Sequence, residues 1–482
     1  MKMVKSLILG SAAALVAMSG AQAADLPLKA KAVEYVKICS LYGAGFYYIP
    51  GTDTCIKLGG YLRADVSFNA SGAYDAPAWS GAAGQKLRTA NSYVFRSRQD
   101  LNIDTRTATE YGVVRTYFDA TFNWTTGDGI AGGTLGVYYA FIQFAGFTIG
   151  KAVSQFDAPW SGYPGNNTSY LLGGYDDVTG INQIAYTAQF GNGVSASISV
   201  EDPVTYTQSA LYNVSGMTAA GVASGVYGTN SYAGAQVPDI VGQLRVDQAW
   251  GLFQLSAAAH QVRASYYGAL ETSGHPSDTW GYAVQAALSL KNLPTGAGDS
   301  INLSAGYSNG ASRYVLGGVT GNSFAMFGNS GIAYQSVAIA GASDGVFAGA
   351  NNVVGTSIEK TSLWGVRGAF NHNWNPYWST SLFGSYTSVD YNGTATARIC
   401  AAIAGPATFS CNPDFRIAQI GLVTRWTPVK NLTFSGELMY TNLDQSYTGT
   451  AVLAPGGLKP TTTYEFKDQG TWTGSLRAQR VF

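Results

Sequence analysis

The chain has 482 residues, with 28 basic and 28 acidic side chains and a formal net charge of zero. Charged residues make up only 12% of the chain and aromatic residues 13%, and there are 60 glycines. A neutral chain gives no electrostatic support for nucleic-acid binding, and soluble domains usually carry roughly 25% charged residues. The composition therefore favours β structure in surroundings that tolerate few exposed charges.

The N-terminus has the features of a secretory signal. Lys2 and Lys5 precede an apolar run that is followed by Ala21-Gln22-Ala23, a cleavage pattern of small residues. The run is shorter than the roughly 20 residues that a membrane-spanning helix needs. We predict that 1–23 is cleaved and that 24–482 is a single mature domain. Within it, 24–55 forms an N-terminal periplasmic or plug-like segment.

The four cysteines fall into two local pairs, Cys39/Cys55 and Cys400/Cys411. Export makes disulfides possible, and local pairing is the simplest of the three connectivities. Free buried thiols are the alternative. The spacing of cysteines and histidines suggests no metal site, and we expect no cofactor.

Residues 92–124 alternate between two faces. Tyr93, Phe95 and Leu101 share one face, whereas Arg96 and Arg98 share the other. A two-residue period is that of a β-strand. The charged face is too dense for the solvent side of an ordinary sheet, and we expect it to line a water-filled lumen.

The same period recurs along the chain and predicts sixteen strands. They are 56–68, two strands within 92–124 divided by a turn near 106–110, 135–145, 146–153, 182–190, 194–201, 240–248, 252–263, 279–290, 300–308, 362–372, 378–390, 415–426, 432–442 and 471–482. The uncharged stretch 131–150 could also be a membrane helix. Its five glycines and its β-branched and aromatic residues favour two strands instead.

The connections between these strands alternate between short turns and long loops, which is the plan of a transmembrane β-barrel. In a bilayer every backbone polar group must be paired internally, so a membrane-spanning sheet has to close. We predict an all-β fold, a transmembrane antiparallel 16-stranded barrel. A barrel of this size is too wide for side chains to fill and should hold an aqueous channel.

The chain resembles the alphaproteobacterial, rhizobial-type porin family in three stretches: "YVKICSLYGAGFYYIPGTDTCIKLGGYLR" (35–63), "FTIGKAVSQFDAPWSGYPG" (147–165) and the C-terminal "LRAQRVF". The terminal Phe482 resembles the assembly signal read by the barrel-assembly machinery. The resemblance implies a homotrimer of general diffusion channels for small hydrophilic solutes, in an outer membrane with its lipids and lipopolysaccharide. It also implies that the third long loop, 154–181, folds inward.

In such porins an acidic inward loop faces a basic patch on the wall. The loop here carries Asp157, Asp176 and Asp177. By strand parity we expect a basic wall of Arg63, Arg96, Arg98, Arg115 and Lys151, with Asp100, Asp104 and Asp119 interleaved. Opposed charges would create a transverse field that favours polar solutes. Alternatively, these residues only pair with one another and pack the loop. The sequence does not fix whether anions or cations are favoured.

Three other functions remain open. In a substrate-selective porin, loop aromatics would bind sugar rings, and 309–361 would hide two further strands. The aromatics concerned are Trp160, Tyr163, Tyr170 and Tyr175. An enzyme is disfavoured because no nucleophile motif accompanies the three histidines, His260, His275 and His372. A secreted adhesin or another soluble all-β protein would need neither a lipid-facing band nor a closing strand.

Overall fold

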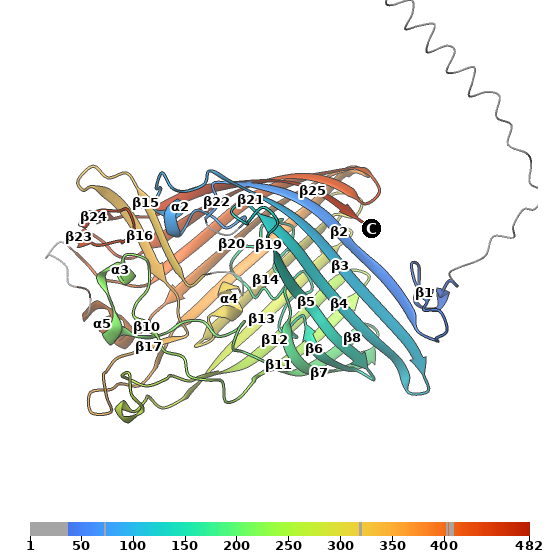
Figure 1. Cartoon of the computed structure of the whole chain (residues 1–482), viewed down its shortest axis with the longest axis horizontal. Helices are drawn as coiled ribbons and strands as arrows, with labels where there is room; N and C mark the ends of the chain where they lie inside the picture. Colours follow the sequence, from blue (N-terminus) through green and yellow to red (C-terminus); the bar gives the residue numbers. More distant parts are fainter. Residues whose placement is uncertain (1–36, 72–73, 318–320, 402, 404–408) are drawn as a thin grey trace, which may run out of the picture.

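The computed structural model describes residues 37–71, 74–317, 321–401, 403 and 409–482. The predicted signal, 1–23, lies outside these residues. Sixteen antiparallel strands form one closed barrel, because the last strand, β25, pairs with the first long strand, β2 (Figure 1). No helix in the described part of the chain has the length and apolar character to cross a membrane.

The barrel strands follow the chain order around the wall. They are β2 (Cys55–Phe68), β3 (Tyr93–Thr109), β4 (Gly112–Thr125), β5 (Thr134–Phe144), β6 (Phe147–Ala152), β7 (Ile181–Gly191), β8 (Val194–Glu201), β11 (Asp239–Gln248), β12 (Gly251–Val262), β13 (Thr279–Lys291), β14 (Ser300–Asn309), β19 (Ser362–Asn375), β20 (Trp378–Asp390), β21 (Phe415–Val429), β22 (Leu432–Gln445) and β25 (Gln469–Val481). Each of the sixteen predicted strands corresponds to one of them. The stretch 131–150 forms β5 and β6, so the alternative of a helix there is wrong.

The two faces of the wall differ as the alternation predicts. Phe95 and Phe122 point outward and are 58% and 51% exposed, whereas Arg96 and Asp100 point into the barrel and are buried. The outer face is therefore apolar and the inner face is charged. A closed sheet leaves no unpaired edge, which is the condition for a wall in contact with lipid.

Short turns join the strands at one end of the barrel, which we call the short-turn rim. In the β7–β8 turn, Asn192 and Gly193 both have positive φ, 50° and 74°. Such a turn matches the twist of the strands, and Asn-Gly adopts it at little cost. The β5–β6 turn has the same character at Ala145 and Gly146, with φ of 48° and 88°.

The first disulfide lies near the short-turn rim. Cys39 and Cys55 are joined with a Cα–Cα distance of 6.1 Å, and β1 (Tyr47–Tyr48) pairs with the start of β2. The Arg106 guanidinium covers the ring of Phe46 at 4.9 Å. This small unit is fixed to the first two long strands.

Long loops fold at the opposite end, the long-loop rim (left in Figure 1). Eight short strands form two four-stranded sheets there: β9 (Leu211–Asn213), β10 (Thr229–Asn230), β17 (Gly345–Phe347) and β18 (Glu359–Lys360) in one, and β15 (Ser323–Gly328), β16 (Gln335–Gly341), β23 (Thr450–Leu453) and β24 (Thr462–Phe466) in the other. The helices of the described chain are η1 (Ser40–Tyr42), α2 (Gly81–Gly84), η2 (Val214–Gly216), α3 (Ala219–Val222), η3 (Glu271–Ser273), α4 (Arg313–Leu316) and α5 (Gly393–Ala401). The strands within 309–361 therefore belong to these sheets, and the eighteen-stranded alternative is wrong.

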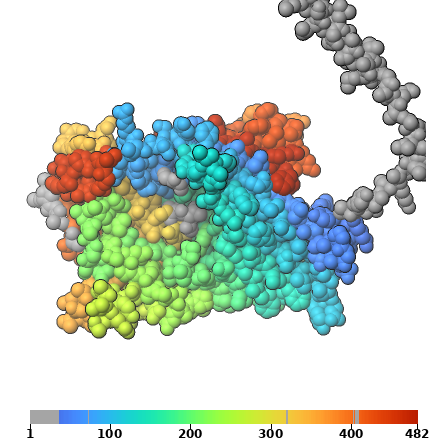
Figure 2. Space-filling view, in the orientation of Figure 1, coloured from blue at the N-terminus to red at the C-terminus, as the bar shows by residue number. Residues whose placement is uncertain are grey.

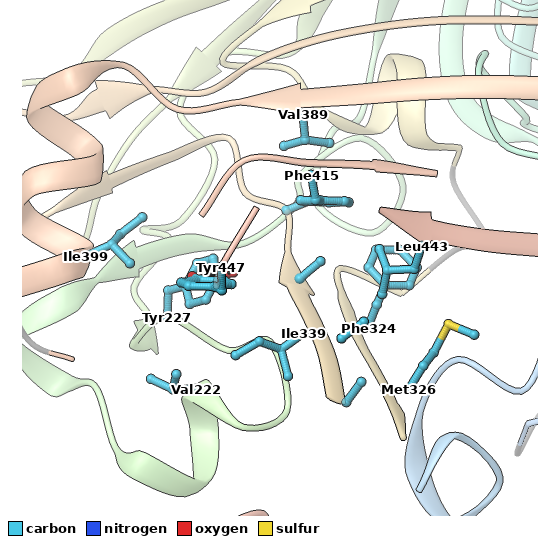
Figure 3. Close-up of a cluster of buried hydrophobic side chains, with 14 of the residues drawn as sticks. Val222, Tyr227, Phe324, Met326, Ile339, Val389, Ile399, Phe415, Leu443 and Tyr447 are labelled. Atoms are coloured by element: carbon cyan, nitrogen blue, oxygen red, sulfur yellow. Dashed lines mark hydrogen bonds between the residues drawn. The ribbon is translucent and has the colours of Figure 1, made fainter. Parts of the chain in front are cut away.

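The long loops share a hydrophobic core with the inner wall (Figure 3). The wall contributes Leu363, Val389, Phe415 and Leu443, all at most 1% exposed. The loop residues labelled in Figure 3 are Val222, Tyr227, Phe324, Met326, Ile339, Ile399 and Tyr447.

A second disulfide, Cys400–Cys411, has a Cα–Cα distance of 5.8 Å and connects α5 to the segment before β21. Both predicted cysteine pairs are therefore confirmed. We call the long loops with their two small sheets the cap. Its hairpins stand out at the left end of Figure 2, in yellow and red.

Candidate pore constriction

Loop 154–181 connects β6 to β7 and runs along the inner wall. Its backbone carbonyls accept hydrogen bonds from lumen-facing side chains of successive strands: Gln243 (β11) to Gln155, Gln254 (β12) to Asp157, Gln285 (β13) to Phe156, Asn302 (β14) to Pro164, Arg367 (β19) to Leu171, Gln419 (β21) to Tyr170 and Arg477 (β25) to Asn167. These bonds place the loop inside the barrel, against the part of the wall from β11 to β25.

The tip of the loop is held by two acidic side chains. The Glu437 carboxylate on β22 accepts hydrogen bonds from the backbone N–H groups of Asn167 and Thr168, the second at 2.9 Å. Asp75, in loop 69–92, accepts the N–H of Ser169 at 3.1 Å. Burial raises the pKa of Asp75 to about 6, although the nearby Arg96 opposes the shift. The tip is therefore fixed on both sides by carboxylates.

The structure brings Asp157, Asp176 and Asp177 together at the neck of the loop. Asp177 accepts the N–H of Ser154 at 2.8 Å, Asp157 accepts the N–H of Asp177 at 2.8 Å, and Asp176 accepts the N–H of Val178 at 3.2 Å. All three aspartates are at most 3% exposed. Their carboxylates hold the backbone of the loop and do not point into open water.

Burial also changes the charge of these three groups. It raises the pKa of Asp157 to about 8 and that of Asp176 to about 6, and the Arg367 guanidinium partly opposes both shifts. Burial raises the pKa of Asp177 well above its usual range, and the neighbouring Asp157 adds to this. At neutral pH, Asp157 is therefore mostly protonated and Asp176 is mostly ionised, and burial disfavours the charged form of Asp177.

Arg63 on β2 and Arg98 on β3 are direct cross-strand partners on the inner face, and both are half-buried. Arg63 donates to the amide oxygen of Gln479 at 2.8 Å, and Arg98 donates to that of Asn123. Among the described residues, neither guanidinium has a carboxylate within the 4.0 Å of an ion pair. A guanidinium is always charged in a protein, so this pair contributes positive charge to the lumen although the two groups repel each other.

Arg96 has a different environment. Its guanidinium lies 2.7 Å from Asp65, which also binds Arg477 of β25 at 2.6 Å. The ring of Tyr74 covers Arg96, with 3.6 Å between the guanidinium carbon and the ring centroid. One carboxylate thus lies between two guanidiniums at the seam where the barrel closes.

Arg115 and Lys151 lie away from this group. Arg115 is 3.0 Å from Asp104, which also binds Arg106 at 2.9 Å, near the β3–β4 turn at the short-turn rim. The prediction that Lys151 faces the lumen is wrong. Lys151 is the cross-strand partner of Ala140 and Asn182, and both of these are exposed on the outer face.

The side-chain amine of Lys151 explains why a cation is tolerated on that face. It turns back to the barrel's long-loop end and donates to the carbonyls of Val137, at 2.8 Å, and Thr179. Alternation along β6 places Lys151 in line with Ile149, which is 48% exposed, so the correct parity could have been counted from that residue.

Three further arginines face the lumen near the loop and are not among the predicted residues of the basic wall: Arg367, Arg425 and Arg477. Arg425 on β21 donates to the carbonyl of Gly165 at 2.6 Å. Alternation in the predicted strands 362–372, 415–426 and 471–482 places all three on the inner face. The signal is therefore present in the sequence, although these strands lie outside the predicted basic wall of the first five strands.

Two of the four loop aromatics pack against other rings. Tyr175 is fully buried and stacks on Tyr314, with ring centroids 4.9 Å apart, and Tyr170 packs against Trp79 at 6.1 Å. The inner wall instead carries a stacked pair, Tyr117 and Phe141, at 5.4 Å. Trp160, Tyr163 and Tyr170 are half-buried, so the substrate-selective alternative stays a prediction.

A closed sixteen-stranded barrel with an apolar outer wall, a charged inner wall and a long loop inside it defines a channel of the outer-membrane class. Comparison with known proteins identifies the particular family. The family model described as "Porin subfamily" matches residues 25–475, and the chain belongs to this family. The predicted family and the predicted outer-membrane location are confirmed.

The most similar relatives include two from Brucella. Porin Omp2b of Brucella abortus (strain 2308) is 33% identical over 304 residues, and Porin Omp2b of Brucella suis biovar 1 (strain 1330) is 32% identical over 308 residues. Each alignment covers 60% of this chain and 75% of the relative. The outer membrane channel DcaP of Acinetobacter baumannii matches the fold with a TM-score of 0.60 at 15% identity, over 90% of this chain and 99% of that one.

Proposed function

We propose that this porin lets small hydrophilic solutes and ions diffuse passively between loop 154–181 and the wall of β2 to β5. Hydrogen bonds occupy the other side of the loop, from β11 to β25. On the proposed path, the lumen-facing Arg63, Arg98, Tyr117 and Asn123 stay half-exposed. No chemical step is part of this function, because passage needs only water and a continuous polar wall.

We propose further that the constriction favours anions. The observation that carries this proposal is the pairing of Arg63 with Arg98, two guanidiniums in cross-strand register that have no carboxylate of the described chain within 4.0 Å. Burial disfavours the charged form of Asp157 and Asp177, which reduces the negative charge of the opposing loop, whereas Asp176 keeps its charge at neutral pH. Two unit charges about 10 Å apart in water interact by only about 0.4 kcal/mol. Selectivity therefore comes from several charges acting together, of which Arg63 and Arg98 have no carboxylate within 4.0 Å among the described residues.

Reversal potentials across a planar bilayer with a KCl gradient test this proposal. The wild-type channel should be anion-selective, and the double variant Arg63→Gln/Arg98→Gln should shift toward cations, because both changes remove unpaired lumenal charge. Arg115→Gln is the matched control. It should shift the potential less, because Arg115 shares Asp104 with Arg106. A cation-selective wild type, or equal shifts in the two variants, would contradict the proposal.

The assembly around the barrel is part of the same proposal. The short-turn rim, with the disulfide unit of 37–55, faces the periplasm, and the long-loop rim faces the outside. The apolar band contacts outer-membrane lipids and lipopolysaccharide, and Phe482 is the residue that the barrel-assembly machinery reads. Membership of the porin family supports a homotrimer as the working form.

A further inference from the structure

His260 lies on the inner face of β12 and is fully buried between two acids. Its Nδ1 is 2.7 Å from the Asp239 carboxylate of β11, and its Nε2 is 3.8 Å from the Asp344 carboxylate of loop 309–361. The hydroxyl of Tyr232, from loop 202–239, lies 3.2 Å from Nε2. One imidazole therefore joins the barrel wall to two of the long loops.

Both carboxylates are saturated by groups from the same two loops. Asp344 accepts the N–H and the hydroxyl of Ser312, the N–H of Ser209 and the Tyr232 hydroxyl. Asp239 accepts the hydroxyls of Thr207 and Tyr314, each at 2.7 Å. The other charged neighbours are Arg313, whose charge acts on Asp344, and Glu201 of β8, whose charge acts on Asp239.

Hydrogen-bond accounting identifies the protonation state that this site needs. The single hydroxyl proton of Tyr232 is donated to Asp344 at 2.6 Å. The hydroxyl oxygen of Tyr232 can then only accept from Nε2, while Asp239 accepts from Nδ1. A neutral imidazole has one N–H group, and only the imidazolium has two. With His260 charged, the charges of Asp239 and Asp344 are balanced by His260 and Arg313.

The site also supports the constriction loop. Tyr314 donates its hydroxyl to Asp239, and its ring stacks on Tyr175 and packs against Phe156 at 4.6 Å. Tyr175 and Phe156 belong to loop 154–181 and are fully buried. A change at His260 therefore reaches the back of the constriction loop through one aromatic side chain.

We infer that His260 is a proton-dependent positioning residue: in its charged form it holds the inward parts of loops 202–239 and 309–361 on the wall and so sets the width of the pore. Loss of the proton from Nε2 removes its hydrogen bond to the Tyr232 oxygen, and it leaves Arg313 as the cation nearest to the buried carboxylates of Asp239, Asp344 and Glu201. Leaving a buried polar group unsatisfied, or a buried charge unpaired, destabilises the site that holds the loops. The anchor is thus complete at low pH and is lost as the pH rises through the titration of His260. This inference rests on the proposed passage past loop 154–181.

Single-channel conductance of the purified full-length protein between pH 5 and pH 10 tests this role. Wild-type conductance should be constant on the acidic side and should rise on the alkaline side. His260→Gln should have the larger conductance at every pH, with no alkaline step. His372→Gln is the matched control. His372 lies 2.7 Å from Asp299 in the same type of pair, but it lies on the outer face, and its variant should keep the wild-type profile.

Asp344→Asn provides a second variant should His260→Gln fail to fold, and it should also lose the alkaline step. A flat wild-type profile, or a wild-type profile in both His260→Gln and Asp344→Asn, would overturn the inference. These readouts differ from those of the proposed function, because the Arg63 and Arg98 variants change the reversal potential and leave the alkaline conductance step in place.

Discussion

At the scale of single residues, the pore is governed by which carboxylates are buried. Asp157, Asp176 and Asp177 bind backbone N–H groups at the loop neck, where burial disfavours their charged form. Arg63 and Arg98 remain half-exposed, donate to the neutral amides of Gln479 and Asn123, and lie over the rings of Tyr61 and Tyr138. The guanidinium charges of Arg63 and Arg98 are therefore fixed, whereas the charge of the loop depends on pH.

The ion selectivity should follow that dependence. Lowering the pH from 7 to 5 protonates Asp176 and Asp75, whose pKa values are about 6, and this loss of negative charge should shift the reversal potential toward anions. Raising the pH from 7 to 9 ionises Asp157, whose pKa is about 8, and should shift it toward cations. Asp176→Asn should remove part of the acidic shift, and a reversal potential that is constant from pH 5 to pH 9 would contradict this account.

Sequence parity predicted the inner-face arginines Arg63, Arg96, Arg98 and Arg115, because side-chain direction in a strand follows from a period of two. It could not predict their partners. Whether an arginine keeps its charge in the lumen depends on a side chain from another strand, such as Asp65 for Arg96 or Gln479 for Arg63. The burial of the loop acids depends on how the loop packs, which has no periodic signal.

At the scale of elements, the constriction loop is a separate unit anchored at its neck and at its tip. The neck is held by its own aspartates, whereas the tip depends on Glu437. Hydrogen bonds to a charged group are worth about 1.5–3 kcal/mol. The tip is therefore the place where a single substitution should free the loop.

Glu437→Gln should make the tip mobile, because an amide accepts the N–H groups of Asn167 and Thr168 more weakly than a carboxylate does. The expected result is greater current noise in the open channel than in wild type. The number of conductance steps should be the same in both. Glu465→Gln is the control, since Glu465 binds the hydroxyl of Ser330 at the long-loop rim and makes no contact with the tip. Equal noise in wild type and Glu437→Gln would show that the tip is held in another way.

The sixteen strands were predictable from sequence because alternation continues over ten or so residues in most of them. The cap at the long-loop rim was not, because its core comes from loops without a regular period. A partial signal exists on the wall. Leu363, Val389 and Phe415 are apolar residues at inward positions, and they lie where the strands meet the long loops. Apolar residues on the lumenal parity near a loop indicate that a loop packs there.

At the scale of the whole molecule, closure of the sheet by β2 and β25 satisfies the backbone within a bilayer and separates two solvents. Lipid meets the face that carries Phe95 and Phe122, and water meets the face that carries Arg98 and Asn123. The channel, its selectivity and its loop anchors all depend on this separation.

Thiol labelling at two consecutive positions of β4 tests the separation directly. The four native cysteines are all in disulfides, so Asn123→Cys and Phe122→Cys each introduce a single free thiol. In a planar bilayer, a charged thiol reagent that cannot enter lipid should react with the cysteine at position 123 and reduce the conductance. The cysteine at position 122 should give no change. Reduced conductance at position 122 with none at position 123 would contradict the account.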